Sequence, residues 1–482
     1  MNPVDAVINF FNPVAGNVRV KARAATAAVM NYDGASRGRR TYGWKAPGTA
    51  ADASGYGGGR IQLRNLSRDF VRNRALAMRA REVIIGAVVG SGIMPSINAP
   101  GMSARRKDQI KAVIEQHLLT KDIDALGENT LAMMQEIIMG AVITDGEVLA
   151  RRRYRDPRFS PDLKLPFQVQ LLEADYLNET ITAWGQNMVF EGVEYGPTGR
   201  IEAYHLWDDH PGAIRRMGSV INSSRVSARD IIHVRRTDRP GQTRGVSWFA
   251  PVMMTLGEIS DYQEAQILKQ RMAALLAGVI STEEDATGAN VADISELSPG
   301  ALVKLPPGNT VNWTDPPKVD GYGEFMGEAI GMIAIGMGIT RESLSGNLSG
   351  VNYSSGRMGH LVQDRNVQRW QQNLMIEQFC VGIEAWTLEA WRLMSTLPKP
   401  DFTLDWTAPR RPLIDPTKEI PAFIEAVDAG MTSMQRVQRE QGLDPEVIRA
   451  ERVQDIEKDK EAQLPARVPA IKPATVNVTQ GG

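Results

Sequence analysis

The stretch that most constrains the fold runs from residue 322 to residue 395. It begins with an apolar, glycine-studded segment, residues 322–339, which predicts one helix whose small residues allow close packing. A polar loop with two similar phrases, residues 343–346 and 347–350, follows and is rich in turn residues. Beyond the loop, apolar side chains recur at three-and-four spacing, which predicts one helix of about forty residues, roughly 60 Å long.

A helix of that length exceeds the usual size in a globular domain. Its apolar stripe can pack against several elements of one chain or against several subunits. One interpretation is therefore an elongated assembly, and the other is a bent core helix in a large single-chain enzyme. This stretch alone leaves both interpretations open.

The overall charge argues against general binding to nucleic acid. The chain has 482 residues, 43% of them apolar and 23% charged, which is typical of soluble globular proteins with two to four domains. Its 55 basic and 56 acidic side chains give a formal net charge of −1. Because tight DNA binding depends on neutralising phosphates, this balance disfavours it, although a local basic patch remains compatible.

The single cysteine, Cys380, lies on the apolar stripe of the long predicted helix and excludes an intramolecular disulfide. We interpret it as a buried apolar residue rather than a catalytic thiol. The first residues lack a basic region before an apolar run, so no secretory signal is expected. The longest apolar stretches, residues 83–94 and 327–339, are shorter than the ~20 residues of a membrane span. These features predict a cytoplasmic protein without a membrane partner.

The N-terminal region, residues 1–59, predicts a short helix followed by a flexible arm rich in Gly, Ala, Ser and Arg. Residues 55–59 resemble a phosphate loop only superficially, because no Lys-Ser/Thr ending and no preceding strand are present. The next segment predicts an amphipathic helix with a cationic face, formed by Arg60, Arg64, Arg68 and Arg72. That face could contact phosphate or an acidic partner, but we favour a solvated face paired with neighbouring carboxylates.

The middle of the chain predicts helices followed by strands. Helices are expected at 104–119 and 126–139, and Asp145-Gly146 then signals a turn. Beyond it the residue pattern changes to period two, with a hairpin at Pro197-Thr-Gly199. We expect a mixed, mostly antiparallel region of about 100 residues, with strands at 147–153, 167–172, 187–195, 200–207 and 230–235.

One cluster carries metal-ligand chemistry: His205, Asp208, Asp209 and His210. It lacks the helical spacing of zinc-binding histidines, and no distant third ligand can be named. We favour a polar loop over a metal site and expect neither a metal nor a cofactor. No nucleophile elbow or paired catalytic carboxylates are evident, so an enzyme is not expected.

A second long helix is predicted over residues 251–280, capped by Ser247 and with Pro251 in its first turn. An insert, residues 281–321, separates it from the helix at 322–339 and carries an acidic loop. Strands are expected in the insert at 301–305 and 310–313. Two long helices would thus flank a small α/β module.

Helix-capping and helix-ending residues divide the C-terminal part of the chain into three predicted helices. Asp415-Pro416 predicts the start of a helix that Gly430 ends, and Thr432 with Gln435 predicts a capping box for the next helix, which stops at Gly442. Asp444-Pro445 begins a third, charged helix that reaches about residue 463. Three prolines and a polar ending indicate a disordered tail over residues 464–482.

Several phrases in this order resemble the lambda-type family of tailed-bacteriophage portal proteins. Each phrase is short, but their order and spacing make the resemblance specific, and it extends from about residue 30 to about residue 460. The phrases are the Arg/Gly-rich arm at 37–44, SRDFVRN at 67–73, VGSGI at 89–93, EAD at 173–175, DIIH at 230–233, GVSW at 245–248, and LSGVNYSS at 348–355 before Arg357.

The resemblance implies an α+β portal fold and a homo-oligomeric ring, normally of twelve subunits, at one capsid vertex. Double-stranded DNA would enter and leave through its channel, and the ring would connect head and tail. The implied parts are a wing with an α/β region (60–250), two stem helices (251–280 and 322–339), a small α/β clip (281–321), a tunnel loop (340–354), a long wing or tunnel helix and its connection (355–414), and a helical crown (415–463).

The resemblance also implies positions and partners. The lumen would be lined by Arg341, Asn347, Ser349 and Asn352, with Arg357 at the start of the next helix. The clip, with Glu283, Glu284, Asp285 and Lys304, would dock the terminase large subunit and later a head-tail adaptor. Major capsid and scaffolding proteins are further implied partners, and assembly in the host cytoplasm would place the protein in the virion. The alternatives are a pore-less virion adaptor or scaffold protein, or a metal-dependent hydrolase.

Overall fold

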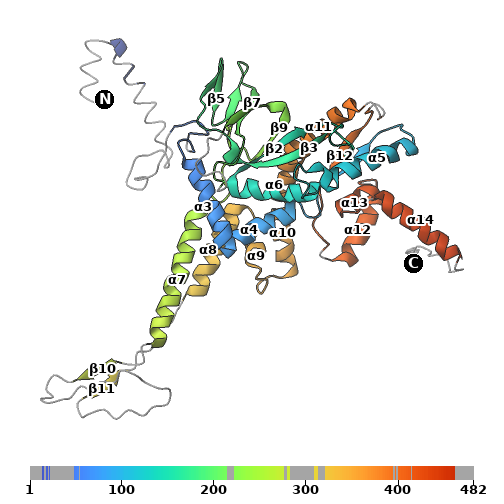
Figure 1. Ribbon diagram of the computed structural model, residues 1–482. Helices are drawn as coiled ribbons and strands as arrows, with labels where there is room; N and C mark the ends of the chain where they lie inside the picture. The colour runs from blue at the N-terminus through green and yellow to red at the C-terminus, as the bar shows by residue number, and fades with distance from the viewer. Residues whose placement is uncertain are drawn as a thin grey trace, which may run out of the picture. The chain divides into compact units, whose positions relative to one another are not determined.

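The computed structural model describes residues 13–15, 18–19, 21, 48–53, 55–213, 222–275, 279–282, 309–312, 321–394, 397, 400–413, 415–443 and 445–461. The chain divides into two units, residues 1–54 and residues 55–482. Elements α3 to α14 and β1 to β12 all belong to the second unit (Figure 1). Helices and antiparallel sheets both contribute to this unit, which confirms the expected α+β class. Within the described residues, no helix combines the length and the apolar character that a membrane crossing requires.

The helices that precede the sheets differ from the prediction at two boundaries. The single helix expected after Arg60 is two helices, α3 (Gly59–Asn73) and α4 (Ala75–Val88), because Arg74 has an extended backbone. Helix α5 (Ala104–Leu118) lies where it was predicted. Helix α6 (Leu131–Asp145) begins five residues later than expected. The reason is Asp124, whose carboxylate accepts backbone N–H groups of the following turn, so that Thr130 becomes the N-cap.

The strands form two main sheets. One has the order β3-β2-β9, and its strands β2 (Glu147–Tyr154), β3 (Phe167–Glu173) and β9 (Ile231–Arg235) lie close to their predicted places. The other has five antiparallel strands in chain order: β4 (Ala183–Trp184), β5 (Asn187–Phe190), β6 (Val193–Tyr195), β7 (Ile201–Trp207) and β8 (Ser223–Ser227).

The single strand expected over residues 187–195 was wrong. Its backbone turns at Glu191 and Gly192, which both have positive φ, and β5 folds back to pair with β6. The predicted turn at Pro197-Thr-Gly199 is confirmed, because it connects β6 to its antiparallel neighbour β7. β4 and β8 were not predicted.

The main core lies between α4, α6, the long helix over residues 353–393 and one face of the three-stranded sheet. Fully buried side chains such as Ile84, Ile138 and Trp391 fill it. A smaller apolar cluster around Leu149, Leu172 and Leu206 packs between the two sheets. The apolar residues of β2 thus alternate between two cores, as expected for a strand covered on both faces.

Helix α7 (Met253–Leu275) is shorter than the predicted 251–280. Pro251 precedes it, and Ser247 instead caps a turn by accepting the N–H of Phe249. Beyond α7, strand β10 (Val279–Thr282) pairs with β11 (Asn309–Asn312). The β-branched run that follows Gly278 favours a strand over a helix. Strand β11 agrees with the one expected at 310–313, whereas the strand expected at 301–305 and residues Glu283, Glu284, Asp285 and Lys304 lie outside the described residues.

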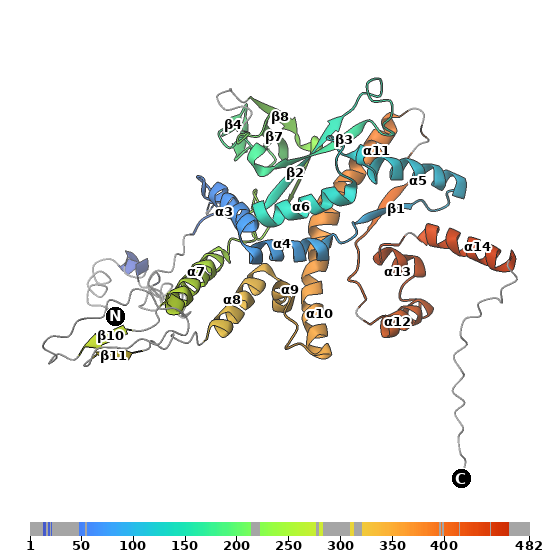
Figure 2. The same cartoon turned by 60° about the horizontal axis from the view of Figure 1, so that its bottom comes forward.

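The long helix predicted after the polar loop is confirmed. Helix α10 (Tyr353–Trp370), the π-helical segment η6 (Gln371–Cys380) and helix α11 (Val381–Leu393) follow one another without interruption. Figure 2 shows α10 continuing into α11 past the end of α4. Helix α8 (Tyr322–Met337) agrees with the predicted 322–339 and lies beside α7 in both ribbon views. The π-helical segment was not predicted.

After α11 the chain pairs β12 (Thr403–Thr407) with β1 (Met94–Asn98), a pairing that was not predicted. Three C-terminal helices then follow, as expected: α12 (Pro416–Asp428), α13 (Met434–Glu440) and α14 (Pro445–Glu461). Gly430 and Gly442 have positive φ at the two predicted helix ends. The N-cap of α13 is Ser433 rather than Thr432, because the Ser433 hydroxyl accepts the N–H of Arg436.

Candidate functional site

The cationic face predicted on α3 is buried for most of its length. Arg60 and Arg64 are almost fully buried, Arg68 is partly buried, and only Arg72, in the last turn, is exposed. A spacing of four residues places these side chains on one side of the helix. That side faces the carboxylates of the chain's own sheets, so three of the four arginines are enclosed within the second unit.

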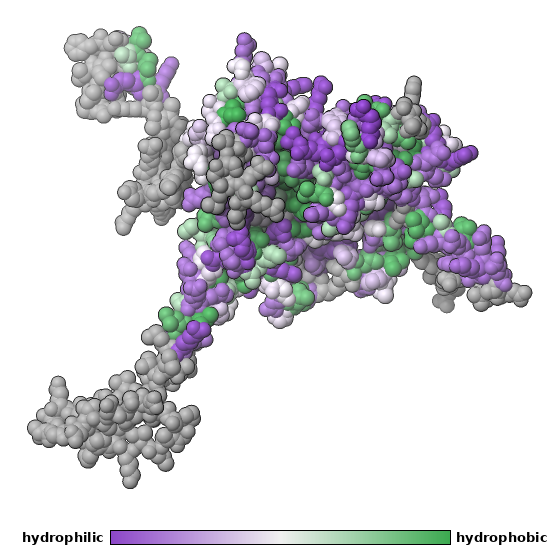
Figure 3. Space-filling view, viewed as in Figure 1, coloured by the Kyte–Doolittle hydropathy of each residue, from purple (hydrophilic) through white to green (hydrophobic). Residues whose placement is uncertain are grey.

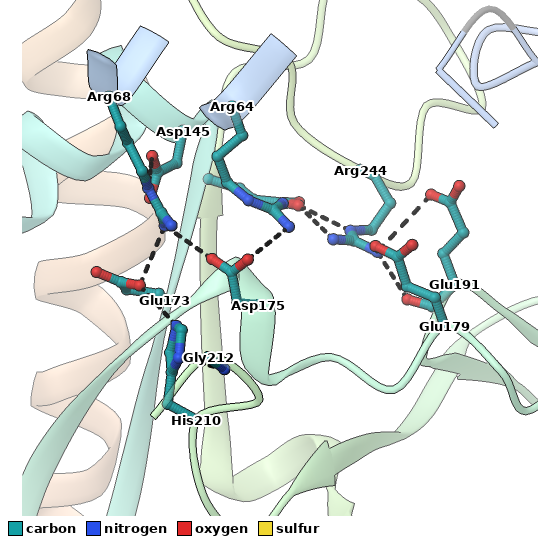
Figure 4. A network of polar contacts seen from close by, with 11 residues as sticks. Arg64, Arg68, Asp145, Glu173, Asp175, Glu179, Glu191, His210, Gly212 and Arg244 are labelled. Carbon is teal, nitrogen blue, oxygen red and sulfur yellow. Dashed lines mark hydrogen bonds and ion pairs between the residues drawn. The ribbon is translucent and has the colours of Figure 1, made fainter. Parts of the chain in front are cut away.

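Each buried arginine of α3 pairs with an acid from a distant part of the chain, and Figure 4 shows this for Arg64 and Arg68. Arg60 pairs with Glu191 at 3.1 Å, and Arg64 pairs with Asp175 at 3.0 Å. Arg68 bridges three carboxylates: Asp145 at 2.6 Å, Asp175 at 2.7 Å and Glu173 at 3.1 Å. Burial alone would lower the pKa of Arg68, but the hydrogen bond and charge of Asp145 raise it overall. These guanidinium groups are therefore held by acids of the same chain.

A second group of charges surrounds Arg244, which is fully buried. Its Nε donates to Glu147 at 2.8 Å, and its Nη1 donates to the carbonyl oxygen of Glu191 at 2.8 Å. Glu147 also accepts the N–H of Gly245 and the Nε2–H of His233, at 2.8 and 2.9 Å. Arg60, Arg64, Arg68 and Arg244 with these acidic partners form what we call the ionic cluster.

Burial and charge act in opposite directions on the acids and bases of this cluster. Burial by itself would raise the pKa of Glu147, but Arg244 and His233 lower it well below its usual value. Burial lowers the pKa of His233 to about 4, so its ring is neutral at pH 7. The site is also sterically tight, because a Cβ on Gly245 would lie 2.2 Å from the carbonyl oxygen of Gly146. The cluster is thus a charge-paired structural joint between α3, β2 and the turn before α7.

The candidate metal ligands at residues 205–210 do not converge. His205 pairs with Glu194 at 2.9 Å, whereas His210 pairs with Glu173 at 3.0 Å. Asp208 accepts the hydroxyl of Ser224. Glu173, Asp175 and His210 do place ligand atoms within 4.8 Å of one another. Arg68 forms ion pairs with both carboxylates of this trio, so the negative charge of the trio is already compensated within the ionic cluster.

The loop expected over residues 340–354 contains a short helix, α9 (Arg341–Ser345). Thr340 caps it by accepting the N–H of Ser343, and Gly346, with φ 69°, ends it. Beyond Gly346 the polar side chains bond to their immediate neighbours. The Asn347 Oδ1 accepts the N–H of Ser349 at 2.9 Å. Asn352 is the N-cap of α10, where it forms a capping box with Ser355.

The five candidate lumen residues are all exposed in the single chain: Arg341, Asn347, Ser349, Asn352 and Arg357. Arg341 lies over α8, since a Cβ on Gly327 would be only 2.6 Å from its guanidinium. Large apolar side chains are exposed in the same part of the molecule, on the loop, on α8 and on α10; they are Phe325, Met332, Ile335, Leu348, Met358, Leu361 and Val362.

Comparison with known families identifies this architecture. A family model described as "Phage portal protein, lambda family" matches residues 37–371, which is more than half of the chain. The chain belongs to the lambda family of phage portal proteins. This confirms the expected portal role over the adaptor and hydrolase alternatives. Portal proteins are structural components of virions rather than enzymes.

Relatives of this portal protein come from several phages. The probable portal protein of Halomonas phage phiHAP-1 is 24% identical, over 84% of this chain and 81% of that protein. The portal protein of Escherichia phage N15 is 24% identical, over 88% of each chain. Portal protein B of Escherichia phage lambda is 25% identical, over 57% of this chain and 59% of that protein.

Solved structures similar to this portal protein include the neck of a native gene transfer agent particle computed with C12 symmetry. That chain is 14% identical, with a TM-score of 0.48, over 80% of this chain and 99% of that one. An HK97 family phage portal protein from Corynebacterium diphtheriae is 13% identical, with a TM-score of 0.32, over 74% of this chain and 98% of that one.

The ionic cluster of the portal protein was found only in part from the sequence. The four-residue spacing of the arginines on α3 revealed the cationic face but not its burial. Glu147, His233 and Arg244 were missed, since they lie on separate elements whose pairing depends on the tertiary fold. Two of these elements carry family phrases, DIIH and GVSW, and those phrases were the available signal.

Proposed function

We propose that copies of this portal protein form a ring, normally of twelve subunits, at one vertex of the capsid. Double-stranded DNA passes through the central channel during packaging and ejection, and the ring connects head and tail. The observation that carries this proposal is the family match over residues 37–371. The exposed apolar residues of α8 and α10 support it, because a neighbouring copy would cover them. The protein assembles in the host cytoplasm, where capsid and scaffolding proteins are its partners.

Helices α7 and α8 serve as the two stem helices in this proposal. Their packing supports the assignment: the ring of Tyr262 on α7 stacks on Tyr322 at 5.9 Å and contacts Phe325 at 4.6 Å. The pairing of β10 with β11 joins the start of the clip, residues 281–321, to its residues 309–312. Residues 60–250 then form the wing, and residues 415–463 form the crown.

The segment around residues 340–354 lines the narrowest part of the channel. Its exposed side chains are mostly short and polar, and those of Asn347 and Asn352 are bonded to their own backbone neighbours. A channel through which DNA slides must not bind phosphates tightly, since each neutralised phosphate adds affinity and therefore resistance to movement. Short, internally satisfied polar residues fit a low-friction lining.

The ring is tested by mass photometry and negative-stain imaging of the purified protein. A ring of twelve chains of 53.0 kDa gives a particle of roughly 640 kDa with a central opening. Single chains without an opening under every assembly condition would favour the pore-less adaptor and refute the proposal.

The channel lining is tested in particles that carry Asn347→Ala and Asn352→Ala together. We expect the length or the retention of the packaged DNA to change, because both residues face the lumen. The matched control is Asn73→Ala at the end of α3, which should change neither quantity. Unchanged length and retention in the double variant would show that the loop is assigned to the wrong place.

The clip docks the terminase large subunit during packaging and a head-tail adaptor afterwards. Its acidic loop with Glu283, Glu284 and Asp285, and the basic residue Lys304, are the docking candidates. Deletion of residues 283–291 should abolish recruitment of both partners in pull-down experiments while leaving the ring intact. If rings of the deletion variant still recruit both proteins, this docking site is ruled out.

A further inference from the structure

A pocket of about 600 Å³ opens beside strand β2, near the point where its neighbour β9 has ended. β2 pairs with β3 as far as Tyr154, but with β9 only as far as Arg151. Within the described residues, the last part of β2 therefore has no strand beside it on the β9 side. The 3-10 turn Ala228–Asp230, which precedes β9, lies beside the end of β2 instead, and its Asp230 contributes to the pocket lining.

Arginines dominate the lining of this pocket. Arg151, Arg153 and Arg155 occupy alternate positions along β2 and directly after it, so their side chains leave the same side of the strand. Gln170 lies opposite Arg151, and Gln168 lies opposite Arg153. Arg155 donates to the Oε1 of Gln168 at 2.7 Å. The three cations of this row follow one another at intervals of roughly 7 Å, the distance between every second residue of a strand.

Two of these arginines have no carboxylate within ion-pair distance in the part of the chain that the structure describes. Arg151 and Arg153 form no ion pair and no side-chain hydrogen bond there. Burial and the nearby charge of Arg153 lower the pKa of Arg151, and the charges of Asp208 and Asp230 offset only part of this shift. This contrasts with the ionic cluster, where every arginine has a carboxylate. Half-buried guanidinium groups without counter-ions favour an anionic ligand.

The remaining walls of the pocket are apolar or already neutralised. Ala125, Leu126, Tyr154 and Val226 line it, and the Leu126 side chain is 70% exposed. The acid in the lining, Asp230, is paired with Arg152 at 2.8 Å. An anion that enters the pocket therefore meets cations and apolar surface but no free carboxylate within the lining.

We propose that this arginine pocket binds an extended acidic segment of a partner protein. Carboxylates at every second residue of such a segment would match the row formed by Arg151, Arg153 and Arg155, because both strands have the same repeat. Arginine binds carboxylates through a planar fork of donors. The alternate side chains would contact the apolar rim near Leu126 and Tyr154.

The pocket fits a peptide better than a DNA duplex. Affinity for DNA comes from a basic surface that follows the phosphate backbone over several contacts. Here the cations are confined to one concave pocket with apolar walls, and the chain as a whole has a net charge of −1. The proposal concerns β2 and its neighbours and does not depend on the DNA channel.

The first test uses the full-length protein and a short fluorescein-labelled peptide of alternating Glu and Val, with binding followed by fluorescence anisotropy. We expect saturable binding that Arg151→Gln and Arg153→Gln each weaken about tenfold, because each removes one charge-assisted contact. A Gln/Val peptide should bind much more weakly. Arg158→Gln is the matched control, since Arg158 is exposed and pairs with Asp156 outside the pocket lining.

A second variant keeps the test informative if an arginine substitution disturbs the fold. Leu126→Glu adds a carboxylate to the exposed rim, and we expect it to weaken the acidic peptide about tenfold without changing the circular dichroism spectrum. The proposal is overturned if the wild-type protein does not bind the peptide, or if the pocket variants bind it as well as the wild type does. It is also overturned if a mixed-sequence DNA duplex binds through the same arginines more tightly than the peptide.

Discussion

The ionic cluster and the polar loop differ in how far apart in the chain their bonded side chains lie. In the cluster, Arg244 and Glu147 are 97 residues apart in the chain, and Arg68 and Asp175 are 107 apart. In the loop, Asn347 and Asn352 bond to groups two and three residues away. The cluster is therefore complete within one chain and ties distant elements together. The loop beyond Gly346 bonds only to near neighbours, and the helices that flank it leave apolar side chains exposed.

This difference separates residues that hold the single chain together from residues that are available to other molecules. Charges buried in the cluster cannot reach DNA or a partner without breaking a paired site. Exposed apolar residues on α8 and α10 cost the folded chain little, because they are not part of its core. Substitutions in the first region should therefore unfold the chain, and substitutions in the second should change assembly alone.

The largest expected effect is the loss of assembly in Ile335→Asp. Ile335 is 75% exposed on α8, and a charge there would have to be buried beneath a neighbouring copy in the ring. We expect mass photometry to show single chains of 53.0 kDa in place of the ring, with an unchanged circular dichroism spectrum. The matched control is Phe159→Asp, which changes an apolar residue after β2 that is 85% exposed and should keep the ring. If the Ile335→Asp variant still forms rings, the exposed apolar face of α8 is not a subunit contact, and the contrast between the two regions is wrong.

The next largest effect is a loss of stability in Arg244→Ala. This change leaves the buried Glu147 carboxylate without its main counter-ion, which typically costs about 3–5 kcal/mol. Urea unfolding is best measured in the Ile335→Asp background, so that a single chain is compared with a single chain. Arg244→Lys should recover part of the loss, because it keeps the charge but not the planar fork. Arg158→Ala, which removes an exposed pair, should leave the urea midpoint unchanged.

A smaller effect concerns pH and the buried ring of His117, which packs against Phe167 at 4.9 Å. Burial lowers the pKa of His117 to about 4, below the 6.5 of an unfolded histidine. The unfolded chain therefore binds a proton that the folded chain does not, and stability is lost as the pH falls from 6.5 towards 4. Between pH 7.5 and pH 5.0 this loss amounts to about 2 kcal/mol.

The measurement compares the urea unfolding of the wild-type protein with that of the His117→Leu variant at pH 7.5 and pH 5.0. The variant should lose about 2 kcal/mol less on acidification, because one proton uptake by the unfolded chain has been removed. Ile114→Val, on the same face of α5, is the control and should lower stability equally at both values. An identical pH dependence in His117→Leu and the wild type would show that this ring does not supply the effect.

Features governed by nearby residues could be predicted from the sequence. The turn at Asp145-Gly146, the hairpin at Pro197-Thr-Gly199 and the helix ends at Gly430 and Gly442 depend on the backbone preferences of those residues alone. The long helix after the loop was predicted because its apolar spacing persists over many turns. The candidate lumen residues came from the family resemblance and stay predictions.

Features that depend on distant residues could not be predicted in this way. Strands β1 and β12 pair Met94 with Thr407. The residues of β12 alternate between polar and apolar, a period-two signal that was overlooked, but β1 lacks such a pattern and lies about 300 residues away in the chain. The start of α6 was misplaced because the carboxylate of Asp124 captures backbone N–H groups that would otherwise begin the helix. The arginines of α3 were found, but the acids that pair with them lie on α6, on β3, on the 3-10 turn Ala174–Tyr176 and on the turn between β5 and β6. Such pairs become visible only once the sheets are assembled.

The smallest predicted effect is in Asn352→Ala. Asn352 caps α10 by accepting the N–H of Ser355 at 2.8 Å, and loss of such a cap costs about 1 kcal/mol. We expect faster hydrogen exchange at the Ser355 and Gly356 amides and no change at the amides of β2. Asn347→Ala is the control, because Asn347 bonds to Ser349 within the loop and caps no helix. Faster exchange that also reached β2 would mean that the loop supports the sheets, and the separation between the two regions would then be wrong.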